Sequence, residues 1–188
     1  MEKKTKTKMK QAFFLGAAMW MAVCLAGAAA AEGVVNAGSG QGEAAEKPGL
    51  FDAFLYFSAP DGAHLKAVSK QFPPGLDAHK LGRALVRALI TGPAPSGVKR
   101  IFPGNTRVNA LFITDGDAYV DLGMDPDSLG ASDTMTEYLG VYSLTNTLTV
   151  NIPQIRRVKI LVNGSEDASF GGHISLAAFF ETNMLIVK

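Results

Sequence analysis

Apolar residues recur at helical spacing in the stretch from residue 78 to residue 90. The stripe consists of Leu81, Ala84, Leu85, Ala88 and Leu89. This spacing predicts an amphipathic helix that must bury one face. Asp77 precedes the stripe as a candidate N-cap, and Thr91-Gly92-Pro93 follows it as a stop signal. We therefore expect a first helix over residues 78–90, packed against the elements that follow it.

The pair Asp115-Gly116 separates two apolar runs and predicts a tight β-hairpin. Two earlier runs, Leu50–Phe57 and Leu65–Phe72, are each followed by a Pro- and Gly-containing turn, which predicts two further strands. Residues 156–162 alternate strictly, with Val158, Ile160 and Val162 on one side. This alternation predicts a half-exposed strand whose other face carries Arg157, Lys159 and Leu161.

A second helix is predicted from about Ser132, because Thr134 and Glu137 have the spacing of a capping box. Its expected inward stripe consists of Tyr138, Leu139, Tyr142 and Thr145. The β-branched residues from Thr147 to Ile152 predict that the helix frays before Pro153. Residues 169–188 form an irregular apolar segment, which we expect to add a last strand or to dock on the sheet.

This order of elements predicts an α+β fold with one mixed β-sheet and two helices packed on one face. Residues 50–188 are expected to form one domain. Residues 32–49 are rich in Gly, Ala and Glu and contain no aromatic residue, so they predict a flexible linker. Residues 1–31 predict a signal peptide or a membrane anchor.

The first 31 residues combine a lysine-rich start, an apolar run over about 12–25 and small residues over 26–31. This pattern is typical of an export signal, with cleavage after Ala30 or Ala31. An alternative is an uncleaved inner-membrane anchor through residues 12–31, since roughly 20 uncharged residues can cross a bilayer. Cys24 follows Val23, a poor match to an acylation signal. We expect an exported protein in the periplasm or cell envelope.

Charge argues against nucleic acid as a partner. Lys and Arg total 18 and Asp and Glu total 17, but five of the lysines lie in the first ten residues. Beyond residue 31 the chain has 13 basic and 16 acidic residues, a net charge of −3. A mildly acidic domain repels a polyanion. The single cysteine lies in the leader, which leaves the domain without a disulfide or a cysteine metal site.

The sequence predicts no catalytic residue, no cofactor and no metal site. The acidic cluster consists of Asp115, Asp117, Asp121, Asp125 and Asp127. Its spacing does not fit a calcium loop, and turn formation explains it more simply. The three histidines, His64, His79 and His173, lack ligand spacing. A Gly-x-Ser-x-Gly elbow does not occur in the sequence.

One candidate partner surface remains, made of Arg156, Arg157, Lys159, Phe179 and Phe180. The basic residues could contact an acidic partner. We favour the simpler interpretation of a solvated strand face, because charges on exposed faces usually need no partner. The adjacent Phe179 and Phe180 cannot both face inward if that segment is a strand. One of these two rings is therefore a candidate partner or membrane contact.

The chain resembles the GerMN domain, a module of exported bacterial proteins named for a spore-germination and sporulation protein. The matching pieces are Leu55-Tyr56-Phe57, Ala88 to Pro93, Ile101 to Thr106, Ala118 to Leu122, Thr145 to Thr149, Val158 to Gly164 and Gly172-His173-Ile174. The resemblance implies a compact α/β interaction or scaffold unit rather than a catalyst, and relatives occur as lipoproteins. Ser175 departs from the family, which often has an acidic residue there, and only one copy of the domain is present.

Leader and resemblance together favour an exported, non-enzymatic cell-envelope module for protein assembly. Its expected partners are another envelope protein or a second copy, with the cell wall or membrane surface as further contacts. Exposed sheet edges offer a physical route to such assembly. The alternative function is a periplasmic domain that binds cell-wall glycan or peptide.

Overall fold

The structure, a computed structural model, describes residues 49–93, 97–125, 133–166, 169 and 171–188, all within one compact unit. The predicted leader (1–31) and all but the last residue of the predicted linker (32–49) lie outside the described residues. The elements in order are β1 (Phe51–Ser58), β2 (Leu65–Phe72), α1 (Ala78–Thr91), β3 (Arg107–Thr114), β4 (Asp117–Gly123), α2 (Thr134–Asn151), β5 (Arg157–Val162), β6 (Phe180–Glu181) and the 3-10 turn η2 (Met184–Ile186).

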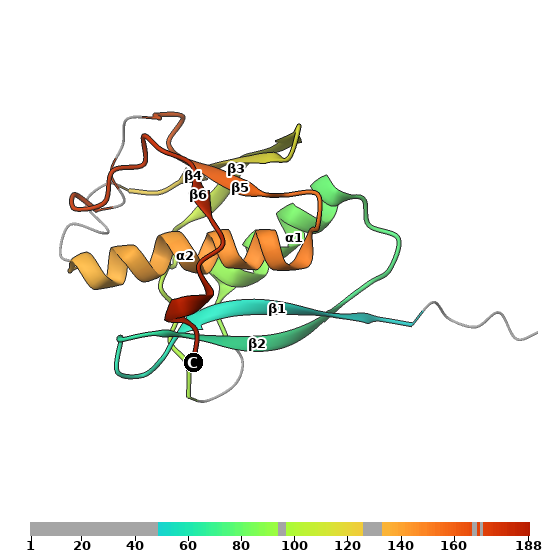
Figure 1. The fold of residues 1–188 in the computed structure, drawn as a ribbon, viewed down its shortest axis with the longest axis horizontal. Helices are drawn as coiled ribbons and strands as arrows, with labels where there is room; N and C mark the ends of the chain where they lie inside the picture. The colour runs from blue at the N-terminus through green and yellow to red at the C-terminus, as the bar shows by residue number, and fades with distance from the viewer. Residues whose placement is uncertain (1–48, 94–96, 126–132, 167–168, 170) are drawn as a thin grey trace, which may run out of the picture. The chain divides into compact units, whose positions relative to one another are not determined.

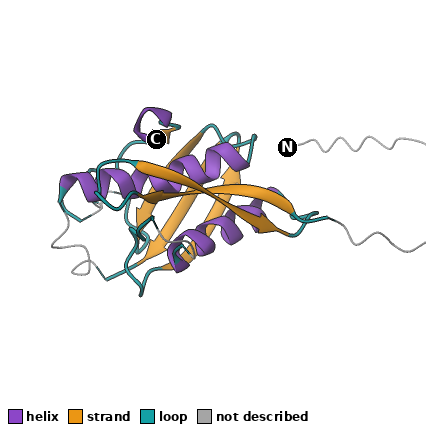
Figure 2. Cartoon of the chain, turned by 90° about the horizontal axis from the view of Figure 1, so that it is seen from below, coloured by secondary structure: helices purple, strands orange, loops and turns teal. Residues whose placement is uncertain are grey.

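The strands form two sheets. β3, β4, β5 and β6 form a mixed sheet in which only β4 and β5 run parallel, and both helices pack on one face of it. The α+β class, the mixed sheet and the two helices on one face are thus confirmed. The expected single sheet is corrected, because β1 and β2 form a separate antiparallel pair across α2 from the four-stranded sheet (Figure 1). Figure 2 shows this pair in front of the helices.

Side chains of α2 occupy the edge of β1 that would otherwise receive another strand. Asn151 accepts a hydrogen bond from the Phe54 amide (2.9 Å) and donates one to the Phe54 carbonyl (2.7 Å). One turn earlier, Thr147 accepts from the Tyr56 amide (3.2 Å), and one turn before that Ser143 donates to the Tyr56 carbonyl (2.5 Å). Four helical residues advance about 6.0 Å and two strand residues about 6.6 Å, so the two spacings nearly match. The hairpin therefore pairs with a helix, which keeps it out of the main sheet.

Helix α2 is buried on nearly all sides. Its buried positions include Leu139, Val141, Leu144 and Leu148, which do not form a single stripe. The prediction of fraying from Thr147 is wrong, because hydrogen bonds to β1 and burial carry the helix through Asn151. A helix enclosed by other elements on most sides loses the simple amphipathic pattern of a surface helix.

The start of α2 also differs from the prediction. Asp133 is the N-cap, and its carboxylate accepts from the Thr136 amide at 2.7 Å. The predicted capping box of Thr134 and Glu137 is wrong, since Glu137 turns inward and is fully buried. The first helix agrees with its prediction: Asp77 caps α1 by accepting from the Lys80 amide at 2.8 Å, and Gly92 follows its last residue.

The C-terminal segment adds a last strand, as expected. It pairs with β5 through β6 and then runs past α2 to the hairpin, where Val187 forms a bridge with Leu65 (Figure 1). Within the described part of the chain, helices are too short or too polar to span a bilayer.

Candidate interaction surface

One face of the four-stranded sheet points away from both helices, and we call it the outer face. Its middle row contains Phe112, Tyr119 and Lys159, which are register partners on β3, β4 and β5. The flanking rows are Ala110, Asp121 and Leu161 on one side and Thr114, Asp117 and Arg157 on the other. Inward positions alternate with these, as for Leu111, Val120 and Ile160, which are buried in the core.

The outer face holds an apolar groove of about 370 Å³, which we call the Phe112 groove. It is lined by Ala110, Phe112, Tyr119, Asp121, Leu161 and Gly164. The Phe112 side chain is 63% exposed, although it lies in the middle of a strand. An aromatic ring beside an apolar groove is typical of surfaces that bind other proteins.

Arg157 lies on the outer face and is held by this chain's own residues. Its guanidinium donates to both carboxylate oxygens of Asp117, at 2.7 and 2.9 Å. The hydrogen bonds from Arg157 hold the pKa of Asp117 below its usual value. The guanidinium carbon also lies 4.2 Å from the centre of the Phe179 ring, which packs edge-on against Tyr119. Arg157 and Phe179 therefore fix the C-terminal segment on the sheet.

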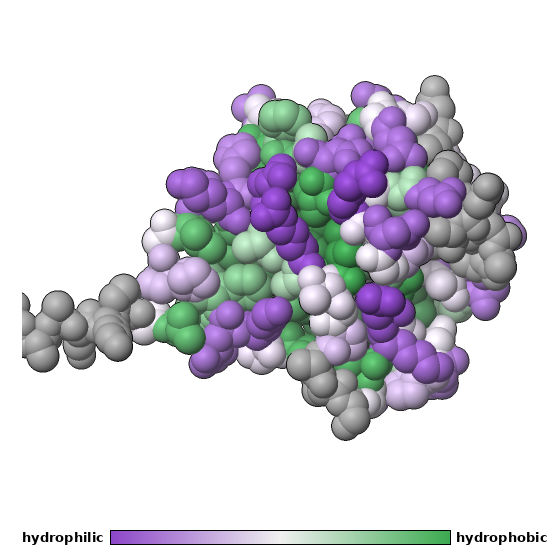
Figure 3. Space-filling model, turned by 180° about the vertical axis from the view of Figure 1, so that it is seen from behind, coloured by the Kyte–Doolittle hydropathy of each residue, from purple (hydrophilic) through white to green (hydrophobic). Residues whose placement is uncertain are grey.

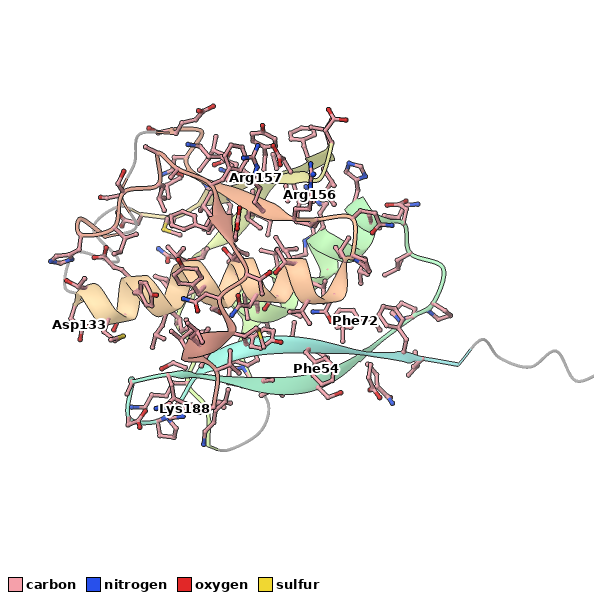
Figure 4. All side chains as sticks on the ribbon, viewed as in Figure 1. Phe54, Phe72, Asp133, Arg156, Arg157 and Lys188 are labelled. Carbon is pink, nitrogen blue, oxygen red and sulfur yellow. The ribbon has the colours of Figure 1, made fainter. Side chains whose placement is uncertain are left out.

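Arg156 holds the turn between β3 and β4. Its guanidinium donates to the Asp115 carbonyl at 2.6 Å, and its amide donates to the Gly116 carbonyl at 2.8 Å. Arg156 and Arg157 lie at the sheet end of the domain, whereas Phe54 and Lys188 lie by the hairpin (Figure 4). Both arginines of the predicted surface thus have partners within the chain.

A left-handed backbone conformation and the close approach of Arg156 both favour glycine at position 116. Gly116 has φ +88°, and a β carbon there would collide with the Arg156 guanidinium. We expect Gly116→Ala to lower the free energy of unfolding by about 2 kcal/mol, from backbone strain and displacement of Arg156. Gly164→Ala is the matched control, because Gly164 has φ +78° and open space around it. In urea titrations an equal loss in the two variants would contradict the proposed contact.

The structure places Lys159 differently from the prediction. Lys159 is only 4% exposed. Its ammonium group donates a hydrogen bond to the Ala177 carbonyl at 2.6 Å and lies 4.0 Å from the Glu166 carboxylate. The expectation that Lys159 lies on a solvated strand face is wrong, because the C-terminal segment covers it. The alternation of side chains along β5 could not reveal this cover.

Phe180 points the opposite way from Phe179. Its ring packs against Tyr142 of α2 with 6.1 Å between ring centres, and it borders the main core. The prediction that the two rings cannot both face inward is confirmed. Of the five predicted surface residues, Arg157 and Phe179 lie together on the outer face and Arg156 lies at the turn between β3 and β4. Lys159 lies beneath the C-terminal segment, and the Phe180 ring of that segment turns toward α2.

The burial of one carboxylate, that of Glu137, was not predicted from the sequence. Glu137 is fully buried, and its carboxylate accepts from the amides of His173 and Ile174, each at 2.9 Å, and contacts the His173 ring nitrogen Nδ1 at 2.6 Å. Burial alone would raise the pKa of Glu137, but these hydrogen bonds together hold it below its usual value. The contact fixes the Gly171-Gly172-His173 loop on α2. A Glu–His pair can also orient an imidazole for chemistry, but a reacting partner is not seen beside it among the described residues.

The aspartates of the acidic cluster that the structure describes make separate structural contacts. Asp115 sits in the hairpin turn with φ +51°, and Asp121 accepts from Asn109 (3.2 Å) and from the Gly164 amide (2.8 Å). Asp127 lies outside the described residues. Groups of three or more His, Cys, Asp or Glu side chains able to hold a metal ion do not occur in the described ranges.

The other two histidines are separate from each other and from His173. His79 of α1 accepts a hydrogen bond from the Ile113 amide at 3.2 Å, on the free edge of β3. His64 lies 3.6 Å from Asp61 in the β1–β2 turn. The His79 contact joins α1 to β3, and the His64 contact stays within one turn.

This fold, with its helix-backed mixed sheet and separate hairpin, defines an α+β module. The family model described as Germane, sporulation and spore germination, matches residues 54–168, more than half of the chain. The chain therefore belongs to this family, and the resemblance to GerMN domains is confirmed.

Two solved structures share the fold. A candidate lipoprotein from Clostridium perfringens is 26% identical, with a TM-score of 0.51 over 71% of this chain and 88% of that one. The tandem GerMN domains of the sporulation protein GerM from Bacillus subtilis are 22% identical, with a TM-score of 0.52 over 71% of this chain and 46% of that one. The chain thus matches about half of the tandem protein. Among curated proteins none matches it.

Proposed function

We propose that this protein is an exported, non-enzymatic module of the cell envelope that binds another protein through the Phe112 groove. The observation that carries the proposal is the 63% exposed Phe112 ring beside an apolar groove of about 370 Å³ on the outer face. Apolar surface of this kind gains free energy when a partner removes it from water. Membership of the Germane family and the likeness to a candidate lipoprotein support the envelope setting.

The free edge of β3 supports the same function. β3 is the outermost strand of its sheet, so its far edge pairs with no strand among the described elements. Residues Val108 to Thr114 carry neither charge nor proline, the usual protections of an exposed edge. His79 occupies the edge at Ile113, and a bulge lies between Val108 and Ala110. Between these two points an extended partner segment could pair with β3 and place side chains in the groove.

Figure 3 shows the side that faces away from the viewer in Figure 1, where hydrophilic and hydrophobic residues are interspersed. A crosslinking experiment also needs a control position outside the groove. Lys80 on α1 serves as the control, since its side chain is 72% exposed and forms an ion pair with Asp77 of the same helix end.

The test is site-specific photocrosslinking in intact cells with the full-length chain. A photoreactive amino acid replaces Phe112 in one variant and Lys80 in the control. We expect a discrete crosslinked protein from position 112 and not from position 80. Crosslinks from both positions to the same species, or from position 112 only to glycan, would contradict the proposal and favour a cell-wall ligand.

Substitution of the same residue gives a quantitative check. We expect Phe112→Glu to lower recovery of that partner in a pull-down at least tenfold, because a carboxylate in an apolar contact costs more than about 1.4 kcal/mol. The melting temperature should stay within a degree or two of the parent, since the ring is largely in water. Thr114→Glu, on the same strand and face, is a control outside the groove.

A further inference from the structure

The far edge of β2, the edge that does not pair with β1, is open along most of its length. β1 and β2 form a two-stranded sheet, and Figure 1 shows β2 on the far side of β1 from α2. At the start of this edge the Lys188 amide donates to the Leu65 carbonyl at 3.0 Å, and Val187 forms a parallel bridge with Leu65. The edge therefore accepts an extended segment at its first residue and is open beyond it.

The register of the hairpin shows which backbone groups the open edge presents. In an antiparallel pair, residues that exchange no hydrogen bonds with each other direct their amides and carbonyls outward. Ser58 bonds outward to Lys99 through both groups, so its register partner Leu65 also faces outward. The same orientation recurs at every second residue of β2, which gives Ala67, Ser69 and Gln71. Hydrogen bonds to their outward backbone groups do not occur within the described part of the chain.

The opposite edge of the hairpin shows how such groups are satisfied. The register partners of Ala67 and Ser69 are Tyr56 and Phe54, whose outward groups bind side chains of α2. The chain thus covers one edge of the hairpin and leaves the other exposed. An exposed edge of this kind is a template for an added strand, because a partner segment can form the missing backbone hydrogen bonds. We call the stretch from Ala67 to Gln71 the β2 edge.

A largely apolar pocket of about 160 Å³ adjoins the β2 edge. Its lining includes Leu55, Phe57, Val68 and Pro93. Leu55 and Val68 are register partners, so the pocket lies on the face of the hairpin that bears their side chains. A cavity of about 150 Å³ can hold a molecule of benzene. The pocket therefore has room for one apolar side chain of a segment that pairs with β2.

Two lysines determine which segment suits this edge. Lys66 and Lys70 lie two residues before and after Val68 and on the same face, and within the described ranges neither forms an ion pair. Two copies joined edge to edge about Val68 would place Lys66 opposite Lys70 twice, and opposed like charges destabilise such a pairing. Lysines at an edge thus keep identical chains apart, whereas acidic side chains of a different segment would pair with them.

We propose that the β2 edge binds an extended acidic segment of another protein by adding it to the hairpin as a third strand. The backbone of the segment pairs with the outward groups of the edge, an apolar side chain enters the pocket beside Val68, and a neighbouring carboxylate contacts Lys70. This surface belongs to the hairpin, whereas the Phe112 groove lies on the four-stranded sheet. The inference and the proposed function can therefore fail independently.

The test measures binding of a fluorescent peptide to the full-length chain by anisotropy. The probe has the sequence Glu-Thr-Leu-Thr-Glu, which places both carboxylates and the leucine on one face of a strand. One control peptide has lysine in place of both glutamates. A second control carries methyl groups on the amide nitrogens of the leucine and both threonines, so it loses the donors that an added strand needs. We expect saturable binding of the probe and at least tenfold weaker binding of either control.

Substitutions in the protein locate the binding site. Ser69→Pro removes an outward amide that β1 does not use, so the hairpin keeps its own hydrogen bonds while the edge is blocked. We expect this variant to bind the probe at least tenfold more weakly, and Ser69→Ala to bind it within twofold of the parent. Lys70→Glu should also weaken binding at least tenfold, whereas Lys80→Glu on α1, the matched control, should not.

The outcomes that would overturn the proposal are distinct. Equal binding of the probe and its N-methylated form would mean that charge alone attracts the peptide. Absence of saturable binding up to about 1 mM peptide would mean that the edge has no useful affinity for an acidic strand. Phe112→Glu should leave binding of the probe unchanged, so a lost crosslink at position 112 with retained peptide binding would count against the proposed function alone.

Discussion

Glu137→Ala should lower the free energy of unfolding by about 2–4 kcal/mol, among the largest effects we expect from one substitution in this domain. The fully buried carboxylate binds two backbone amides and the His173 ring, and alanine leaves all three without that acceptor. Unpaired buried donors typically cost about 1–3 kcal/mol each, and the half-exposed His173 ring can recover part of the loss from water. Urea unfolding followed by circular dichroism measures the change.

Glu137→Gln separates hydrogen bonding from charge. Its amide oxygen can still accept from His173 and Ile174, so we expect a loss of only about 1 kcal/mol at neutral pH. The pKa of Glu137 is lowered in the folded state, so its stabilising contribution is complete above the unfolded value of about 4.3 and declines as pH falls through the folded value. The difference between parent and Gln variant should therefore shrink below about pH 4. A constant difference between pH 3 and pH 7 would contradict the role of the ionised carboxylate.

Local signals in the sequence predicted the elements well. Asp77 and Gly92 bound α1, and Asp115-Gly116 turns β3 into β4, because capping and tight turns depend on a few adjacent residues. The alternation in β5 also gave its inward residues Val158 and Ile160. These features require no knowledge of the rest of the chain.

The features that could not be predicted from the sequence depend on contacts between residues far apart in the chain. Lys159 looked exposed because its cover comes from Ala177, 18 residues later. Glu137 looked like part of a helix cap because its partner His173 is 36 residues away. The β1–β2 hairpin lies outside the main sheet because polar side chains of α2, about 90 residues from β1, form hydrogen bonds with the backbone at the edge of β1. In each case a polar side chain binds the backbone or ring of a remote segment, and neither periodicity nor propensity encodes such a pairing.

Because α2 is buried between the hairpin and the main sheet, we expect two similar substitutions on it to change the free energy of unfolding in opposite directions. Thr145 and Thr147 are both fully buried on the same helix. The Thr147 hydroxyl accepts a hydrogen bond from the buried Tyr56 amide at 3.2 Å, whereas the Thr145 hydroxyl has no hydrogen-bond partner among the described residues. Threonine and valine have nearly the same shape, so exchange of one for the other changes mainly the hydrogen bonding.

We expect Thr147→Val to lower the free energy of unfolding by about 1–3 kcal/mol, because it leaves the Tyr56 amide unpaired at the edge of β1. Thr145→Val should raise it by up to about 1 kcal/mol, because a methyl group replaces a buried hydroxyl that gains nothing from its surroundings. Urea titrations of the two variants and the parent, read at the same pH, measure both signs. Equal losses in the two variants would mean that Thr147 contributes only packing, and the pairing of β1 with α2 would then depend on Asn151 and Ser143 alone.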